Sequence, residues 1–175
     1  METTNRLSLR GVRLRSRNFR GEVKDFNERG NRNVLVVLGK DNARDLGFDN
    51  LTDMYNALKA DNWNIKRFNV TEDNDDPDCF IPANAVYFDN EKSMIFMKTA
   101  RGKGRLLTED SVAILDGAEI ENVDVILNKH YYNSHGREGY NTRIKSMEVT
   151  IIEDDICARN SYDDNDETEF PYPER

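Results

Sequence analysis

The amino-acid sequence predicts a mainly β protein: a small β-barrel with one or two short helices, followed by a disordered acidic C-terminal tail. Three observations favour this fold class. Short apolar and β-branched runs recur along the chain between glycines and polar turns. Segment 51–58 has apolar residues at helical spacing. The last stretch, 151–175, holds nine acidic side chains against two arginines and is poor in apolar residues, which is typical of disorder.

Length and composition favour one folded domain. The chain has 175 residues, of which 37% are hydrophobic, so we expect a folded domain over 1–160 and a flexible tail over 161–175. Cys79 and Cys157 do not make a disulfide framework, and neither has a second ligand at metal spacing. The N-terminus lacks an apolar leader, and no window is long enough to span a membrane. We therefore expect a soluble, cytoplasmic protein without a metal or cofactor.

The first predicted strand bends at Gly11. Two apolar pairs flank this glycine with opposite parity: Leu7 and Leu9 before it, Val12 and Leu14 after it. A bulge or bend at Gly11 would keep both pairs on the core side. Strict alternation then gives the other face three cations and a ring, Arg13, Arg15, Arg17 and Phe19.

The middle of the chain predicts strands around one helix. The run NVLVVLG, 33–39, is typical of a strand buried on both faces. The polar loop before it carries Lys24, Phe26, Arg29 and Arg32. Helix 51–58 has Asp49 or Asn50 at its N-cap position. Further strands are expected at 63–70, 83–88 and 93–98.

The second half predicts two strands around an aromatic loop. Segment 99–107 lacks the spacing of a phosphate-binding P-loop and is expected to be a mobile basic loop. Thr108 is expected to cap a short helix that contains Val112 and Leu115. Strands are expected at 123–127 and 143–152, with a polar, aromatic loop at 128–140 between them. In the last strand, alternation groups Ile144 with Ser146 and Glu148, opposite Met147, Val149 and Ile151.

The positions of the charged and aromatic residues favour a nucleic-acid-binding protein. Residues 1–40 hold ten basic against four acidic side chains, which indicates a nucleic-acid surface, although a dipolar solubility pattern gives the same count. Short strands with basic, aromatic loops favour an OB-fold, which binds oligonucleotides across one face. The candidate contacts are Arg13, Arg15, Arg17, Phe19, Lys24, Phe26, Arg29, Arg32, Trp63, Lys66, Arg101, Lys103, Arg105, Tyr131, Tyr132 and Arg137. Each ring is also compatible with packing in the core or at its rim. For Trp63, packing and nucleic-acid binding are equally favoured.

Four stretches carry a family resemblance: SRNFRGEVKDFNERGNRNVLVVL, KADNWNIKRFN, LLTEDSVAILDGAEIENVDVIL and REGYNTRIKSMEVTIIEDD. In order and spacing the chain resembles bacteriophage single-stranded DNA-binding proteins of the OB-fold type over roughly residues 12–160. The resemblance implies non-catalytic, largely sequence-independent coating of single-stranded DNA in phage replication or recombination, within the host cytoplasm. Self-association into a homo-oligomer stays open.

The C-terminal tail carries a candidate partner-binding motif, and two alternative functions remain open. Phe170, Pro171 and Tyr172 resemble the handle by which bacterial single-strand binders recruit replication and repair partners. A magnesium-dependent nuclease that uses Asp73, Asp75 and Asp76 is the enzyme alternative, although no catalytic signature accompanies these residues. An acidic mimic of DNA is the interaction alternative, but its carboxylates should cover the folded body rather than crowd the tail and one loop.

Overall fold

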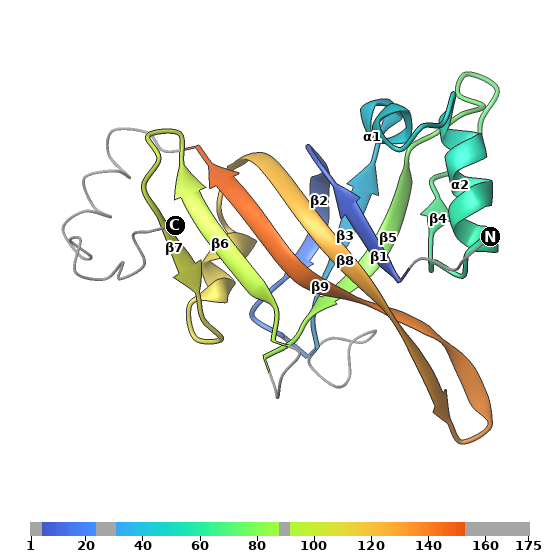
Figure 1. Cartoon of the computed structure of the whole chain (residues 1–175). Coiled ribbons are helices and arrows are strands. Elements are labelled where there is room, and N and C mark those ends of the chain that lie inside the picture. Colours follow the sequence, from blue (N-terminus) through green and yellow to red (C-terminus); the bar gives the residue numbers. More distant parts are fainter. Residues whose placement is uncertain (1–4, 24–30, 88–91, 153–175) are drawn as a thin grey trace.

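The structure is a computed structural model that describes residues 5–23, 31–87 and 92–152 (Figure 1). Its helices are α1 (Lys40–Asp45), α2 (Leu51–Ala60) and the short 3-10 helix η2 (Val112–Asp116). Its strands are β1 (Arg6–Leu9), β2 (Arg13–Asn18), β3 (Arg32–Leu38), β4 (Lys66–Arg67), β5 (Cys79–Ala85), β6 (Met94–Thr99), β7 (Gly104–Leu107), β8 (Ile120–Ser134) and β9 (Arg137–Ile151).

The strands form a mixed sheet that curves into an OB-like barrel, as the sequence predicts. Its path runs β1-β8-β9-β5-β3-β2, and its two outer strands are consecutive in the chain, so they act as the halves of one bent strand. At their junction the N–H of Val12 donates to the carbonyl of Val123 on β8, 3.0 Å away. β5 and β9 run parallel, whereas the other neighbours on this path are antiparallel. Off this path, β4 pairs with β5, and β6 pairs with β7 and β9. Strands from all of these pairs contribute to one core.

The chain bends at Gly11, as the opposite parity of the two apolar pairs predicts. Gly11 has a φ of 64°, in the left-handed region that favours glycine. Its N–H donates to a carboxylate oxygen of Asp124 at 2.9 Å. Leu7, Leu9 and Val12 are all buried in the core cluster as a result. The bend therefore lets β1 and β2 both contribute apolar side chains to the interior.

Helix α2 covers part of the barrel and buries Leu51, Met54 and Leu58. Asn50 caps it by accepting a hydrogen bond from the N–H of Asp53 at 2.7 Å, which confirms one of the two expected caps. Asp76 reinforces this end because its carboxylate accepts bonds from the N–H groups of Leu51 and Thr52. Within the described residues, no helix has the length and apolar character needed to cross a membrane.

Two β-bulges change the alternation that the sequence predicts. In β2 the register shifts between Arg15 and Asn18, where Ser16 has a φ of 54°. In β9 the register slips by one residue around Lys145, opposite Ile126 and Leu127. Ile144 therefore joins Met147 in the core instead of sharing a face with Ser146. The prediction of strict alternation is wrong at both places.

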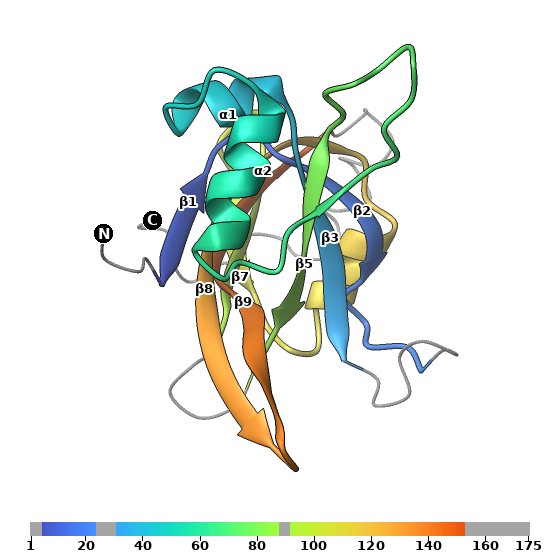
Figure 2. The same ribbon diagram turned by 90° about the vertical axis from the view of Figure 1, so that its right-hand side faces the viewer.

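The segment 128–140 is not the loop that the sequence predicts. It continues β8 and starts β9, and the two strands pair up to Ser134 and Arg137. His135 and Gly136 have φ angles of 51° and 81°, which fits a two-residue hairpin turn with two left-handed residues. We call residues 130–141 the arm, which extends from the barrel in Figures 1 and 2.

Replacing Gly11 by alanine should lower the free energy of unfolding by about 1–2 kcal/mol, because a side chain there is forced into the left-handed region. A Cβ at this position would be 3.7 Å from Asn122 Oδ1, so crowding adds little. Gly117→Ala is the matched control, since Gly117 has a φ of −112° and open space around it. Urea unfolding of both variants measures the difference, and equal changes would contradict the role of the bend.

Candidate nucleic-acid interface

Three cross-strand rows build the outer face of the barrel. Residues opposite each other on paired strands point to the same side of a sheet, so the register fixes which side chains meet. The first row is Arg13, Val37, Phe80 and Lys66; the second is Arg15, Leu35 and Pro82; the third is Asn18, Asn33, Asn84 and Arg143. Val37 and Asn18 are buried, and we call the surface made by the other members of these rows the binding face. Figure 2 shows its strands β2, β3 and β5 side by side.

Two phenylalanine rings lie at the β4 end of this face. Phe68 follows β4 and Phe80 belongs to β5, with ring centroids 4.7 Å apart and planes tilted by 42°. The guanidinium of Arg15 lies 5.1 Å from the centre of the Phe68 ring. Both rings are half-buried. A flat ring beside a cation suits nucleotides, because the base can stack while the cation attracts the phosphate.

A hollow of about 370 Å³ lies along the third row, and four asparagines line it. They come from different segments: Asn33 from β3, Asn64 from the chain before β4, Asn84 from β5 and Asn141 from the arm. An amide side chain offers both donors and an acceptor, so it can bond to the edge of any base. The lining therefore suits recognition without a fixed sequence.

A buried lysine fixes the base of the arm. The side chain of Lys129 is 0% exposed, and its ammonium donates to the backbone carbonyl of Asp61 at the end of α2. The Asp61 carboxylate lies 3.6 Å away. The rings of Trp63 and Tyr140 lie 5.1 and 5.3 Å from the same ammonium. A buried charge with these partners is costly to move, so Lys129 holds the arm against α2.

The structure brings some of the predicted contacts together. Arg13, Arg15 and Lys66 lie on the binding face, where Arg13 also forms an ion pair with Asp78. Tyr131 and Tyr132 lie on the arm with Arg137, and the two tyrosines are 55% and 39% exposed. These positions suit contact with a bound strand.

Other predicted contacts lie elsewhere. Phe19 and Trp63 are 0% and 2% exposed in the core, so neither ring can stack on a base in this conformation. Arg17 turns inward at the β2 bulge and donates to the carbonyls of Leu115 and Ala118, both at 2.8 Å. Arg32 is ion-paired with Glu109 at 3.5 Å.

The remaining candidates are on the far hairpin or outside the described residues. Arg101, Lys103 and Arg105 belong to the β6–β7 hairpin, which Figure 1 shows on the opposite side of the molecule from α2 and the arm. Lys24, Phe26, Arg29, Phe170, Pro171 and Tyr172 lie outside the described residues. Asp76, a candidate of the nuclease alternative, is engaged by the first N–H groups of α2.

Sequence reasoning missed Phe68, Phe80, Asn84 and Arg143. The signal for Phe80 and Asn84 was the alternation in CFIPANA, 79–85, where Cys79, Ile81, Ala83 and Ala85 are buried and the residues between them are not. Pro82 hid this strand, since proline is rare inside sheets. Phe68 shares the parity of Lys66, which marked it as outward-facing once a strand was assigned there.

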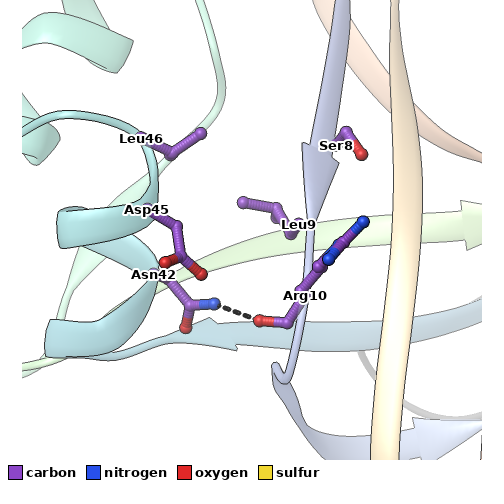
Figure 3. Close-up of a pocket in the computed structure, with 6 residues that line it drawn as sticks. All are labelled: Ser8, Leu9, Arg10, Asn42, Asp45 and Leu46. Carbon is purple, nitrogen blue, oxygen red and sulfur yellow. Dashed lines mark hydrogen bonds between the residues drawn. The ribbon is translucent and has the colours of Figure 1, made fainter.

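Figure 3 shows a different hollow, between β1 and α1. The Asn42 amide donates to the carbonyl of Arg10 at 2.6 Å, and Asn42 Oδ1 accepts from the N–H of Gly39. Asn42 thus satisfies backbone groups at the β1–β2 corner and at the start of α1. In Figure 2, α1 is at the end of the barrel opposite the tip of the arm. None of the described residues that line this hollow belongs to the three rows of the binding face.

An OB-like barrel with cations, rings and amides on one face has the construction of single-strand nucleic-acid-binding proteins. The family model described as a phage ssDNA-binding domain matches residues 2–169, and the chain belongs to this family. This match confirms the sequence-based prediction of a phage-type single-stranded DNA-binding protein.

Solved structures agree on the fold. The single-stranded DNA-binding protein from bacteriophage Enc34 covers 83% of this chain and 80% of its own, with 9% identity and a TM-score of 0.50. The same protein in complex with ssDNA covers 86% of this chain and 88% of its own, with 10% identity and a TM-score of 0.53. Among curated proteins, none matches this sequence significantly.

Replacing Phe68 or Phe80 by alanine should weaken binding of single-stranded DNA by about 1–3 kcal/mol per lost stacking contact. Phe96→Ala is the matched control, because Phe96 is also half-buried but belongs to β6, outside the three rows. Fluorescence titration with an oligothymidylate measures affinity, and circular dichroism verifies folding. Equal losses in all three folded variants would show that stacking does not occur at this ring pair.

Proposed function

We propose that this chain coats and protects single-stranded DNA with little sequence preference, without catalysing a reaction, during phage replication or recombination in the host cell. The observation that carries the proposal is the binding face itself. Its three rows, with the adjacent Phe68, combine cations for phosphates, rings for stacking and amides for base edges. Each of these interactions is available with any base.

The path of the strand follows from the order of the rows. Arg13, Arg15 and Lys66 attract the backbone at the β4 end, and Phe68 and Phe80 receive bases there. The asparagine-lined hollow continues toward β9, where Asn141 and Thr142 of that strand line it. Asp78 competes with phosphate for Arg13. A phosphate at Arg13 must therefore displace the Asp78 carboxylate, which reduces the net electrostatic free energy of binding.

A salt series tests this proposal. Contacts with about four to six phosphates should give a log–log slope of roughly −3 to −4, because each phosphate on a single strand contributes about −0.7. Affinity for an oligothymidylate should be higher than for a duplex of the same length, since paired bases cannot stack on the rings. Salt-independent binding, or preference for the duplex, would contradict the proposal.

The acidic tail belongs to the same proposal. We expect residues 161–175 to recruit replication or recombination proteins and to compete with DNA for the cationic strand. Ile152, the last described residue, lines a hollow of about 480 Å³ together with Arg13, Arg15 and Arg17, so the described chain ends beside β2. A tethered polyanion at that position has a high effective concentration at the binding face.

Truncation after Ser161 should therefore leave the fold intact and raise affinity for single-stranded DNA several-fold at low salt, where screening is weak. It should also abolish recruitment of partner proteins. Titrations of the full and truncated chains at two ionic strengths measure the first effect. Identical affinities at the lower ionic strength would mean that the tail does not compete for the binding face.

A further inference from the structure

We infer that a second nucleotide site lies at the base of the arm and extends the path of bound single-stranded DNA beyond the binding face. The inference rests on the proposed function and adds to it a site with a stated ligand, the phosphodiester backbone. The site is a hollow of about 390 Å³, which we call the arm-base pocket. Its lining is Lys92, Met94, Asn128, His130, Arg143, Ile144 and Lys145.

The chemistry of the lining selects an anion. Two lysines, an arginine and a histidine contribute to it, and none of the described residues that line it carries a carboxylate. In an acidic protein with a net charge of −8, a local concentration of cations attracts polyanions by their phosphates. Met94 is 38% exposed and provides an apolar contact for a sugar or a base. The pocket therefore suits a nucleotide.

Strand pairing brings these side chains together. Arg143 is opposite Asn128 in the β8–β9 ladder, and His130 is opposite Asn141, so all four share the outer side of the ribbon. The bulge at Lys145 shifts the following residues by one position. Lys92 reaches the same place because its neighbour Ser93 is buried and donates through its hydroxyl to the carbonyl of Ile144 at 2.6 Å.

The arm-base pocket is continuous with the binding face. Arg143 is the β9 partner of Asn84, and Asn84 lines the asparagine-rich hollow. Asn141 lines that hollow too, and it pairs with His130 of the arm-base pocket. A strand that leaves the binding face over β9 thus meets the pocket next. A short oligomer fills the binding face, and a longer one also reaches the arm-base pocket.

The test uses the double variant Lys92→Gln/Lys145→Gln, in the full chain, with oligothymidylates of about 6 and about 20 nucleotides. The first length is near the lower end of the site sizes of single OB-folds, and the second is longer than them. The matched control is Lys40→Gln/Lys59→Gln, which removes two exposed lysines at the ends of α1 and α2. Thermal melting verifies that both variants fold.

The double variant should bind the longer oligomer roughly ten-fold more weakly at low salt, and its log–log salt slope should be smaller in magnitude by about 1.4, for two lost phosphate contacts. Binding of the shorter oligomer should match that of the control. Equal losses of affinity for both lengths, or losses no larger than those of the control, would contradict a nucleotide site in the arm-base pocket but not the proposed function. Failure of the unmodified chain to bind either oligomer would overturn both.

Discussion

At Gly11 the first strand turns through a left-handed backbone conformation, and the Asp124 carboxylate holds the glycine N–H at 2.9 Å. The next N–H, of Val12, bonds to β8. This one turn lets a single strand lie along β8 with its first half and along β3 with its second half. It also sets the parity of β2, which puts Val12 inside and Arg13 and Arg15 outside. The barrel and the cations of its binding face therefore share one cause.

Different interactions hold the binding face and the arm in position. The face is positioned by the ladder of β2, β3 and β5, where register alone fixes which side chains are neighbours. The arm is a two-stranded ribbon, a structure that is marginal by itself, and the buried Lys129 ties its base to α2. Rigid rows can offer stacking and phosphate contacts at fixed spacing, while the arm provides exposed rings beside them.

The sequence was sufficient for the fold class because its strands are short, alternating and separated by glycines and polar turns. The bend at Gly11, the α2 cap at Asn50 and the outward direction of Arg13 and Arg15 all follow from local patterns. The bulges at Ser16 and Lys145 do not, because tertiary contacts decide where a strand takes an extra residue. The arm was missed since His-Gly is a weaker turn signal than Asn-Gly or Asp-Gly.

The candidate site was only partly predictable for a related reason. Composition identifies cations and rings, but burial decides which of them a ligand can reach. Phe19 and Trp63 have the same chemistry as Phe68 and Phe80, yet the first two fill the core and the second two lie on the outer side of strands. α1, with six residues, is too short for periodicity to reveal.

The most direct measurement is a map of backbone amide chemical shifts by NMR as an oligothymidylate is added to the full chain. If single-stranded DNA binds to the binding face, the changes in chemical shift will concentrate in β2, β3, β4 and β5 and at the base of the arm. Shifts that concentrate instead around β1 and α1, at the hollow of Figure 3, or on the β6–β7 hairpin would contradict it.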